Sequence, residues 1–283
     1  MINIFYSYKE NGPGKVIKNL IAGLAKINVP YSENPDVNSL KEGDMILSLQ
    51  SHYVMSRNDL TKNMIVGPNI CVMPFDNQMV MNQNYITHLV PSEWVKNYFS
   101  KYISVDKINV WAVGIDTDKF KDTSTVTKTV DCLLYYKRRN IDDLMYMSNI
   151  LAKNNQSFEV IEYGSYTEEH FINTINKSKY ACLCCGSESQ GIAIQEIMSS
   201  NLPLFVWDIA EWNDRGSELA CPATSVPYWN EQCGIVERDK NKLNESFQHF
   251  LSDLLTFTPR ELILKELTLE KKAKDLFDLF NSN

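Results

Sequence analysis

The chain has 283 residues, of which 44% are hydrophobic and 11% aromatic, and its formal net charge is −7. This length suits two domains of roughly 120–150 residues, each with its own core. The negative charge argues against a nucleic-acid-binding protein, because a basic excess is needed to neutralise phosphates. No apolar stretch reaches the roughly 20 residues that cross a bilayer, and the first residues lack the pattern of a signal peptide. We therefore expect a globular, cytoplasmic protein without a transmembrane segment.

The seven cysteines fit the same compartment. Cys182, Cys184 and Cys185 lie in one apolar run, and no histidine or second cysteine pair stands at zinc-finger spacing from them. An odd number of cysteines argues against a disulfide framework. We expect reduced thiols in the core and no metal site.

Short apolar strands alternate with helical patterns in the first half of the chain. Strands are expected over 2–7, 45–49, 64–67, 87–90 and 108–113. Apolar residues with a spacing near 3.6 mark a helix from Val16 to Ile27, and Ser92 is the expected N-cap of a second helix. Residues 116–129 are polar and have the composition of a linker.

A second alternating set begins at residues 130–136, continues through 158–161 and ends near residue 237, and the tail that follows is helical. We therefore predict two α/β domains, over 1–120 and 121–260, and a C-terminal helix over 261–283 that packs back towards the first domain. The cleft between two such domains is the default place for a ligand.

The most informative segment runs from Glu188 to Glu196. An apolar run over 180–185 precedes it, a helical pattern over 192–198 overlaps it, and a Pro-introduced run over 204–207 follows. This order predicts a β-α-β unit, in which Glu188 lies at the carboxyl end of a strand, where α/β sheets bind ligands. Gly191 at the helix N-terminus favours a phosphate site, and Glu196 could accept hydrogen bonds from two sugar hydroxyls. Two solvated surface charges are the alternative, but the whole pattern argues against it.

Three segments resemble the retaining, nucleotide-sugar-dependent glycosyltransferases of the GT-B architecture, which has two facing Rossmann-like domains with a cleft between them. The Glu188…Glu196 pair matches their E-x7-E motif, residues 90–95 resemble their VPSEWV-type segment, and residues 113–120 resemble the GVD…F signature that closes the acceptor domain. The resemblance implies a nucleotide-diphosphate sugar as donor and a glycan, lipid-linked or protein-linked acceptor. It implies no metal or other cofactor.

The resemblance also implies roles for individual residues. Glu196 would hold the donor ribose, and Glu188 would face the transferred sugar as the catalytic carboxylate. In the front-face route proposed for this class, the leaving diphosphate takes the acceptor proton, so the protein mainly stabilises charge. Lys137 and Arg138 match the family's diphosphate-binding pair, although the run Lys137-Arg138-Arg139 leaves open which side chains point inward. Tyr166, in the loop over 163–166, would stack on or border the base, and an exposed loop tyrosine is the alternative. The remaining donor-binding residues would be Ser189, Gly191 and Ile192.

Some residues of the first domain also resemble features of this glycosyltransferase family. The segment from Gly12 through Gly14 to Lys15 resembles a glycine-rich loop that approaches phosphate or acceptor, though Gly-Pro-Gly is also an ordinary turn. Asn69 takes the place where relatives often carry a histidine, whereas His88 lies inside a predicted strand and is expected in the core. Asp116-Thr117-Asp118 spells a metal-binding D-x-D, but its place in the interdomain signature argues against that role.

Two other functions fit parts of the pattern. A degenerate GT-B protein would bind a nucleotide or glycan without transferring sugar, and the compressed basic motif and short chain leave room for it. A nucleotide-sugar epimerase would have the same architecture, but such enzymes use histidines around the sugar and this chain has four in all. We therefore favour the transferase.

Overall fold

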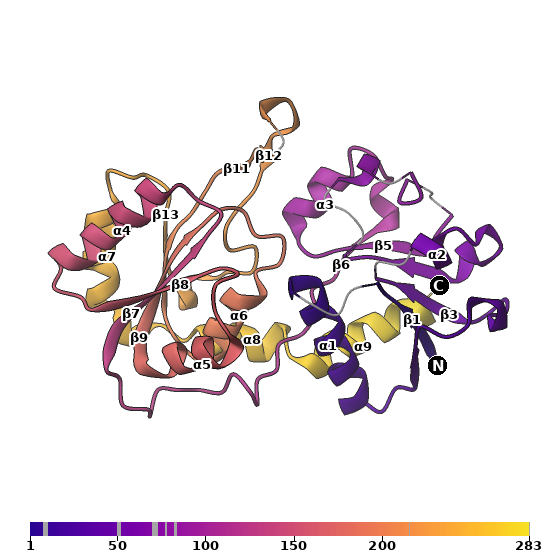
Figure 1. The fold of residues 1–283 in the computed structure, drawn as a ribbon, viewed down its shortest axis with the longest axis horizontal. Coiled ribbons are helices and arrows are strands. Elements are labelled where there is room, and N and C mark those ends of the chain that lie inside the picture. The colour runs from indigo at the N-terminus through magenta and orange to yellow at the C-terminus, as the bar shows by residue number, and fades with distance from the viewer. Residues whose placement is uncertain are drawn as a thin grey trace. The chain divides into compact units, whose positions relative to one another are not determined.

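A computed structural model describes residues 1–7, 11–49, 52–69, 73–76, 78–81, 84–214 and 216–282. The chain forms two compact units, one of Met1–Gly114 with Leu267–Asn283 and the other of Ile115–Glu266 (Figure 1). Both are α/β units built on a parallel sheet, which confirms the predicted fold class. No helix among the described residues is long and apolar enough to span a membrane.

The first unit contains a six-stranded sheet with the order β2-β1-β3-β4-β5-β6, in which every neighbouring pair is parallel. Its strands are β1 (Ile2–Phe5), β2 (Tyr31–Glu33), β3 (Met45–Ser48), β4 (Met64–Val66), β5 (Thr87–Val90) and β6 (Ile108–Val110). Its helices are α1 (Asn11–Lys26), α2 (His52–Met55), α3 (Glu93–Phe99) and α9 (Leu269–Asn281). The strand order changes direction at β1, so right-handed crossovers place helices on both faces.

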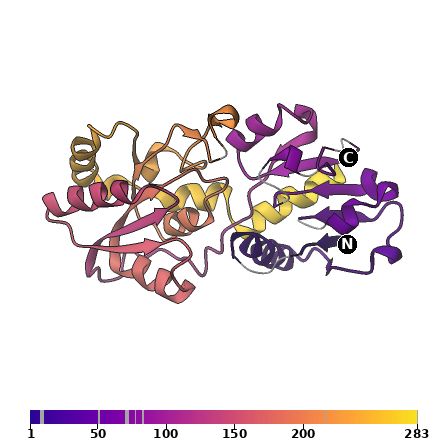
Figure 2. The ribbon, with the colours of Figure 1, turned by 45° about the horizontal axis from the view of Figure 1, so that its top comes forward.

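The C-terminal helix α9 is an integral part of this first unit. It lies beside α1 in both ribbon views (Figures 1 and 2). The indole of the fully buried Trp111 donates a hydrogen bond to the carbonyl of Lys272 on α9, at 2.8 Å. Leu276 and Ala273 of α9 are also buried. The chain therefore returns to its first unit to complete that unit's core.

The second unit has a five-stranded sheet with the order β13-β10-β9-β7-β8, again parallel throughout. Its strands are β7 (Val130–Lys137), β8 (Phe158–Glu162), β9 (Ser178–Cys185), β10 (Leu204–Trp207) and β13 (Gly234–Glu237). The short strands β11 (Glu211–Trp212) and β12 (Cys221–Pro222) form an antiparallel ribbon. Its helices are α4 (Ile141–Lys153), α5 (Glu168–Lys177), α6 (Ile192–Ser199), α7 (Leu243–Ser252) and α8 (Pro259–Glu266).

Successive side chains of the buried strands point to opposite faces of the sheet, so the core of the second unit has two layers. On one face, alternate residues of β7 and β9, among them Leu134 and Cys182, form one cluster with residues of α4 and α7, among them Phe247 of α7. On the other face, Tyr135 contacts Phe171 of α5. The six cysteines among the described residues are buried free thiols, as the sequence led us to expect.

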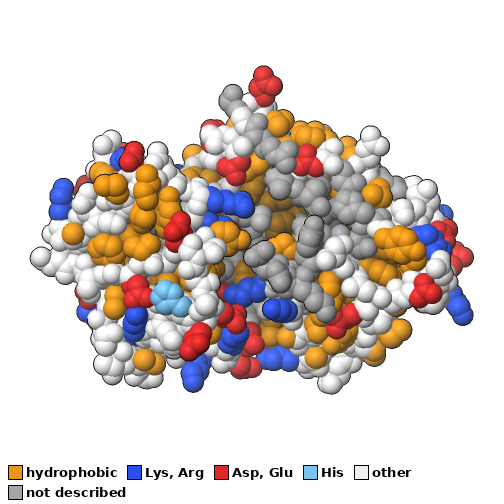
Figure 3. Space-filling model, in the orientation of Figure 1, with side chains coloured by type: hydrophobic (Ala, Val, Ile, Leu, Met, Phe, Trp, Pro, Cys, Tyr) orange, Lys and Arg blue, Asp and Glu red, His pale blue; other side chains and the backbone are white. Residues whose placement is uncertain are grey.

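Charged side chains of both signs are mixed over the coloured part of the molecular face in Figure 3. Lys and Arg side chains lie next to Asp and Glu side chains there, and that part of the surface shows no continuous basic patch. This distribution fits the net charge of −7.

Glu159 on β8 makes the stability of the second unit depend on pH. Its carboxylate accepts hydrogen bonds from Lys177 (2.5 Å), Thr174 (2.7 Å) and His170 (2.9 Å), and the bond to Lys177 is the largest of the causes that lower its pKa from 4.5 to about 2. Because the folded pKa lies below the unfolded value, the stabilisation is present above about pH 4.5 and is lost as the pH falls towards 2.

We therefore expect the melting temperature of the wild type to fall more steeply between pH 5 and about 3 than that of Glu159→Gln, which has no carboxylate to protonate. Thermal denaturation followed by circular dichroism checks this, with Glu169→Gln, an exposed position on α5, as the control. Parallel curves for the wild type and Glu159→Gln would contradict the role of this carboxylate.

Candidate functional site

The site of the second unit lies where the strand order of its sheet reverses, between β7 and β9. Lys137 ends β7 and pairs in register with Cys185, which ends β9. One hydrogen bond beyond the strands continues the pairing, from the amide of Gly186 to the carbonyl of Lys137, at 2.8 Å. The chain leaves β7 and β9 for opposite faces of the sheet, so the two loops separate at this edge, which is where open α/β sheets bind ligands.

Lys137 and Glu188 form an ion pair at this edge. The Lys137 Nζ atom lies 2.7 Å from Oε1 and 2.8 Å from Oε2 of Glu188, and the exposed fractions of the two side chains are 15% and 7%. Burial raises the pKa of the Glu188 carboxyl, while the charge and hydrogen bond of Lys137 oppose that rise. The ammonium also lies 4.2 Å from the centre of the Tyr163 ring, in a cation–π contact. A carboxylate and a cation are thus held together at the edge of the sheet.

The two arginines after Lys137 have different surroundings. The Arg139 guanidinium donates to Asp143 and to the carbonyls of Cys185 and Trp207, and it stacks 4.2 Å from the Trp207 ring. These contacts join the ends of β9 and β10, so Arg139 stabilises the sheet. Arg138 is exposed, has a left-handed backbone (φ 49°) and lies near enough to Glu188 for its charge to oppose the rise in the pKa of that carboxyl. Lys137 and Arg138 are therefore the cations of the run that lie near Glu188.

The N-terminus of α6 borders the same loop. Gly191 precedes the helix in a left-handed conformation (φ 79°), and no side chain caps the helix among the described residues. The first amides of any α-helix lack carbonyl partners within it and favour an anion. The loop before the helix is fixed by Gln190, whose side-chain amide donates to Gln195 Oε1 at 3.0 Å and whose carbonyl accepts from Gln195 at 3.1 Å. Ser189, by contrast, is exposed.

Glu196 lies one turn further along α6 and is 1% exposed. Its negative charge, like that of Glu188, contributes to raising the pKa of Tyr166 to about 12, after burial, which is the main cause. The neighbouring Tyr135 side chain opposes that rise in pKa. Both glutamates of the E-x7-E pair therefore act electrostatically on the same tyrosine.

Tyr166 is a partly buried residue that packs against other aromatic rings, and it is not an exposed loop tyrosine. Its ring packs against Phe171 at 5.1 Å between centroids and against Tyr135 at 6.5 Å, and the residue is only partly exposed. Tyr163, in the same loop, is the more exposed tyrosine.

The glycine-rich segment of the first unit is helical and does not form the expected loop. Helix α1 begins at Asn11, so Gly12, Gly14 and Lys15 lie in its first turns. Pro13 is compatible with that position, because a first-turn residue needs neither its amide nor a free φ angle. Asn69 donates a hydrogen bond to the Pro13 carbonyl at 3.3 Å.

His88 and Asp116, which the sequence analysis excluded from the site, make hydrogen bonds that stabilise the fold. The buried ring of His88 is hydrogen bonded to the carbonyls of Val80 (2.8 Å) and Lys107 (3.4 Å), which confirms the expected core position. The Asp116 carboxylate accepts from the amides of Asp118 and Lys119 and closes a turn.

Gly12 offers a clean test of whether a ligand approaches the start of α1. A Cβ atom at this position would meet nothing within 4 Å, and the φ angle is not positive. We expect Gly12→Ala to raise the stability of the protein by up to about 1 kcal/mol, because alanine is the better helix former. Denaturant unfolding checks this, and destabilisation would contradict the helical assignment. Loss of activity in a stabilised Gly12→Ala protein would show that a ligand occupies the space beside the backbone.

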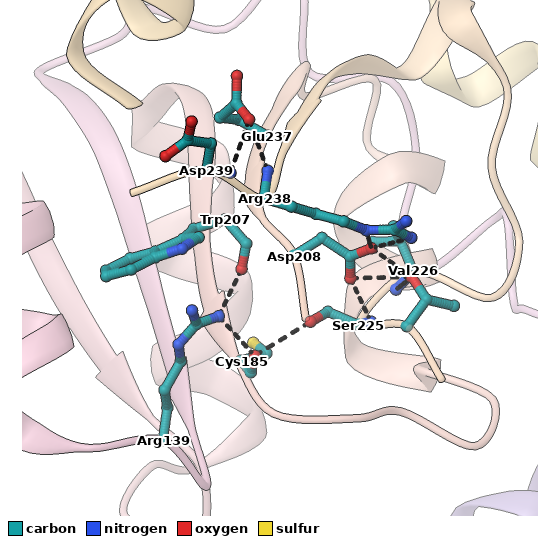
Figure 4. Close-up of polar contacts among 10 residues, drawn as sticks. Arg139, Cys185, Trp207, Asp208, Ser225, Val226, Glu237, Arg238 and Asp239 are labelled. Carbon is teal, nitrogen blue, oxygen red and sulfur yellow. Dashed lines mark hydrogen bonds and ion pairs between the residues drawn. The ribbon is translucent and has the colours of Figure 1, made fainter. Parts of the chain in front are cut away.

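Sequence reasoning missed a buried carboxylate next to this site. Asp208 follows β10 directly and is held by Arg238, Thr224 and Ser225 (Figure 4). The available signal was a charged residue immediately after a predicted buried strand, at the edge where the carboxyl ends of parallel strands meet.

Comparisons with known proteins found solved structures that are similar to this chain. No protein-family model matches the sequence, and no curated protein matches it. A sucrose-phosphate synthase from Thermosynechococcus elongatus has a TM-score of 0.65 at 12% identity, with 99% of this chain and 98% of the other covered. The lipopolysaccharide outer core galactosyltransferase WaaB in its apo form has a TM-score of 0.64 at 13% identity, with 100% and 99% covered.

A third structure, Anabaena HepE in complex with UDP and glucose, has a TM-score of 0.62 at 9% identity, with 100% of this chain and 99% of the other covered. Similarity at such low identity is informative about the fold. The chain has the two-unit α/β fold of these proteins, the architecture known as GT-B.

Proposed function

We propose that the protein is a retaining, metal-independent glycosyltransferase that moves a sugar from a nucleotide-diphosphate donor to a hydroxyl group of a glycan, lipid-linked or protein-linked acceptor. The observation that carries the proposal is the grouping at one sheet edge of the Lys137–Glu188 pair, the N-terminus of α6 and the buried Glu196. The shared fold with glycosyltransferases supports it.

The donor diphosphate would bind at the N-terminus of α6. The amides of Gly191 and Ile192 would donate to it, and Lys137 and Arg138 would supply positive charge. Glu196 would accept hydrogen bonds from the ribose hydroxyls, and Tyr166 and Ser189 would border the donor. The buried Lys137–Glu188 pair would then rearrange, because the diphosphate competes with Glu188 for the ammonium.

The transfer step would need no nucleophile from the protein. The bond between the anomeric carbon and the diphosphate oxygen breaks, a bond from that carbon to the acceptor oxygen forms on the same face, and the acceptor proton passes to the departing diphosphate. Lys137, Arg138 and the amides of α6 would stabilise the charge that develops on the leaving group. Glu188 would face the sugar and stabilise positive charge near the anomeric carbon.

A donor screen tests this function. The full chain is mixed with UDP-glucose, UDP-galactose, UDP-N-acetylglucosamine and GDP-mannose, and the melting temperature is measured, because a bound ligand raises it by mass action. With the donor that binds, hydrolysis or transfer is followed by NMR, which also gives the anomeric configuration, in the presence and absence of EDTA.

We expect slow hydrolysis or transfer with the α-configuration of the donor kept and no effect of EDTA. Binding without any turnover would support the non-catalytic alternative instead. An inverted product would reject the retaining mechanism, and loss of turnover in EDTA would reject metal independence.

A further inference from the structure

The geometry points to Asp208 as a positioning residue for Glu188. The connection between the two residues runs through the loop over 224–226. The placement of the Glu188 backbone by this route can be tested on the protein alone, whereas its consequence for sugar transfer rests on the proposed function.

Asp208 gathers four hydrogen-bond donors at the end of β10 (Figure 4). Its Oδ1 accepts from the hydroxyl of Thr224 at 2.9 Å and from the amide of Ser225 at 2.7 Å. Its Oδ2 accepts from Nε of Arg238 at 3.0 Å and from a terminal guanidinium nitrogen of Arg238 at 2.8 Å. The Asp208 side chain is 1% exposed, whereas that of Arg238 is 60% exposed. The carboxylate is thus a buried charge whose partners are one largely exposed arginine and the backbone and hydroxyl of one loop.

The loop that Asp208 holds is bonded in turn to the chain around Glu188. The carbonyl of Thr224 accepts a hydrogen bond from the Glu188 amide at 3.0 Å. The Ser225 hydroxyl donates to the carbonyl of Cys185, the last residue of β9, at 3.0 Å (Figure 4). The segment from Cys185 to Glu188 is therefore fastened to the loop at both of its ends.

This arrangement makes the position of Glu188 depend on a residue outside the proposed donor site. A buried carboxylate that loses its partners is strongly unfavourable, so Asp208 requires the loop and Arg238 together. In Asp208→Asn the side-chain NH2 group must face one of the four donors, so at least one of these contacts is lost. Where the NH2 group faces Thr224 or Ser225, the loop is released from β10 and the Glu188 amide loses a fixed acceptor.

The chain supplies a matched control at the opposite end of the same sheet. Asp131, near the start of β7, accepts from the amide (2.8 Å) and hydroxyl (2.7 Å) of Ser157 and pairs with Lys179 at 2.6 Å. It therefore accepts from an amide, a hydroxyl and a cation as Asp208 does, although its side chain is 21% exposed, and it lies far along the strand from Glu188. Asp131→Asn measures what loss of such a group does to the unit in general.

Hydrogen exchange measured by mass spectrometry on a peptide covering 186–195 tests the positioning without any ligand. We expect Asp208→Asn to speed exchange of the Glu188 amide about tenfold and Asp131→Asn to leave it unchanged. Thr224→Val should act like Asp208→Asn and Thr224→Ser like the wild type, so the proposal remains testable if Asp208→Asn does not fold. Unchanged exchange in Thr224→Val, or equal acceleration in Asp131→Asn, would overturn it.

The donor identified in the screen then tests the consequence for transfer. We expect Asp208→Asn to lower kcat at least about tenfold while the affinity for the free nucleoside diphosphate stays within about twofold, because Glu196 and the α6 amides are untouched. Equal losses in both quantities would indicate general damage and reject the catalytic part. If the wild type binds no donor, the proposed function fails, whereas the exchange experiment still decides the placement of Glu188.

Discussion

Replacing Glu196 by alanine is expected to lower the affinity for the nucleotide-sugar donor at least about 100-fold, as measured by isothermal titration calorimetry. The side chain is 1% exposed and lies on α6, the helix whose N-terminus would bind the diphosphate. A hydrogen bond to a charged group contributes about 1.5–3 kcal/mol, and about 1.4 kcal/mol corresponds to tenfold in affinity. Loss of two such bonds to ribose hydroxyls therefore accounts for the expected effect.

Two further variants separate binding from folding. Glu196→Gln keeps the size of the side chain and tests the charge, so we expect an intermediate affinity. Glu169→Ala, at an exposed position of α5 in the same unit, should bind the donor as the wild type does. Unchanged donor affinity in a folded Glu196→Ala protein would count decisively against the ribose-binding role.

Gly234→Ala is expected to prevent stable folding of the second unit. A Cβ atom at Gly234 would lie 1.9 Å from the Leu204 carbonyl oxygen, and the backbone has a φ of 140° that residues with a Cβ rarely adopt. Leu204 is its partner in the pairing of β13 with β10, so the strands would have to separate to relieve the clash. We expect a loss of more than about 4 kcal/mol, the range of the most damaging substitutions.

Gly164→Ala separates backbone strain from the clash. Gly164 also has a positive φ, 87°, but a Cβ atom there would meet nothing within 4 Å. We expect this variant to cost only about 1–2 kcal/mol, the strain of the left-handed backbone alone. Chemical denaturation gives both values, and similar losses for the two variants would contradict the role of strand contact at Gly234.

The sequence already contained the order of the elements and the position of the central motif. The apolar run before Glu188 and the helical spacing after Gly191 are local patterns, and they predicted β9, α6 and β10 close to their observed bounds. The same reasoning placed His88 in the core, because it lies within an apolar strand. Strand, loop and helix are encoded over a few residues, so one sequence suffices to find them.

The structure of the glycine-rich segment could not be predicted from its local composition. Gly12, Pro13 and Gly14 have the composition of a turn, yet α1 includes them from Asn11 onwards. Pro and Gly weaken a helix interior far more than its first turn, where the amides have no partners within the helix. The preference for a turn therefore did not decide the start of the helix.

The tertiary structure decided which charged side chains meet. Of the run Lys137-Arg138-Arg139, the sequence could not say which residues face the motif, whereas the fold pairs Lys137 with Glu188 and uses Arg139 to join β9 and β10. Asp208 and Thr224 are far from Glu188 along the chain, and their connection to it exists only because parallel strands end side by side. The sequence by itself thus determined the elements and the motif, since these depend on neighbouring residues. Only the fold determined the partners of each charge, because those contacts join separate strands.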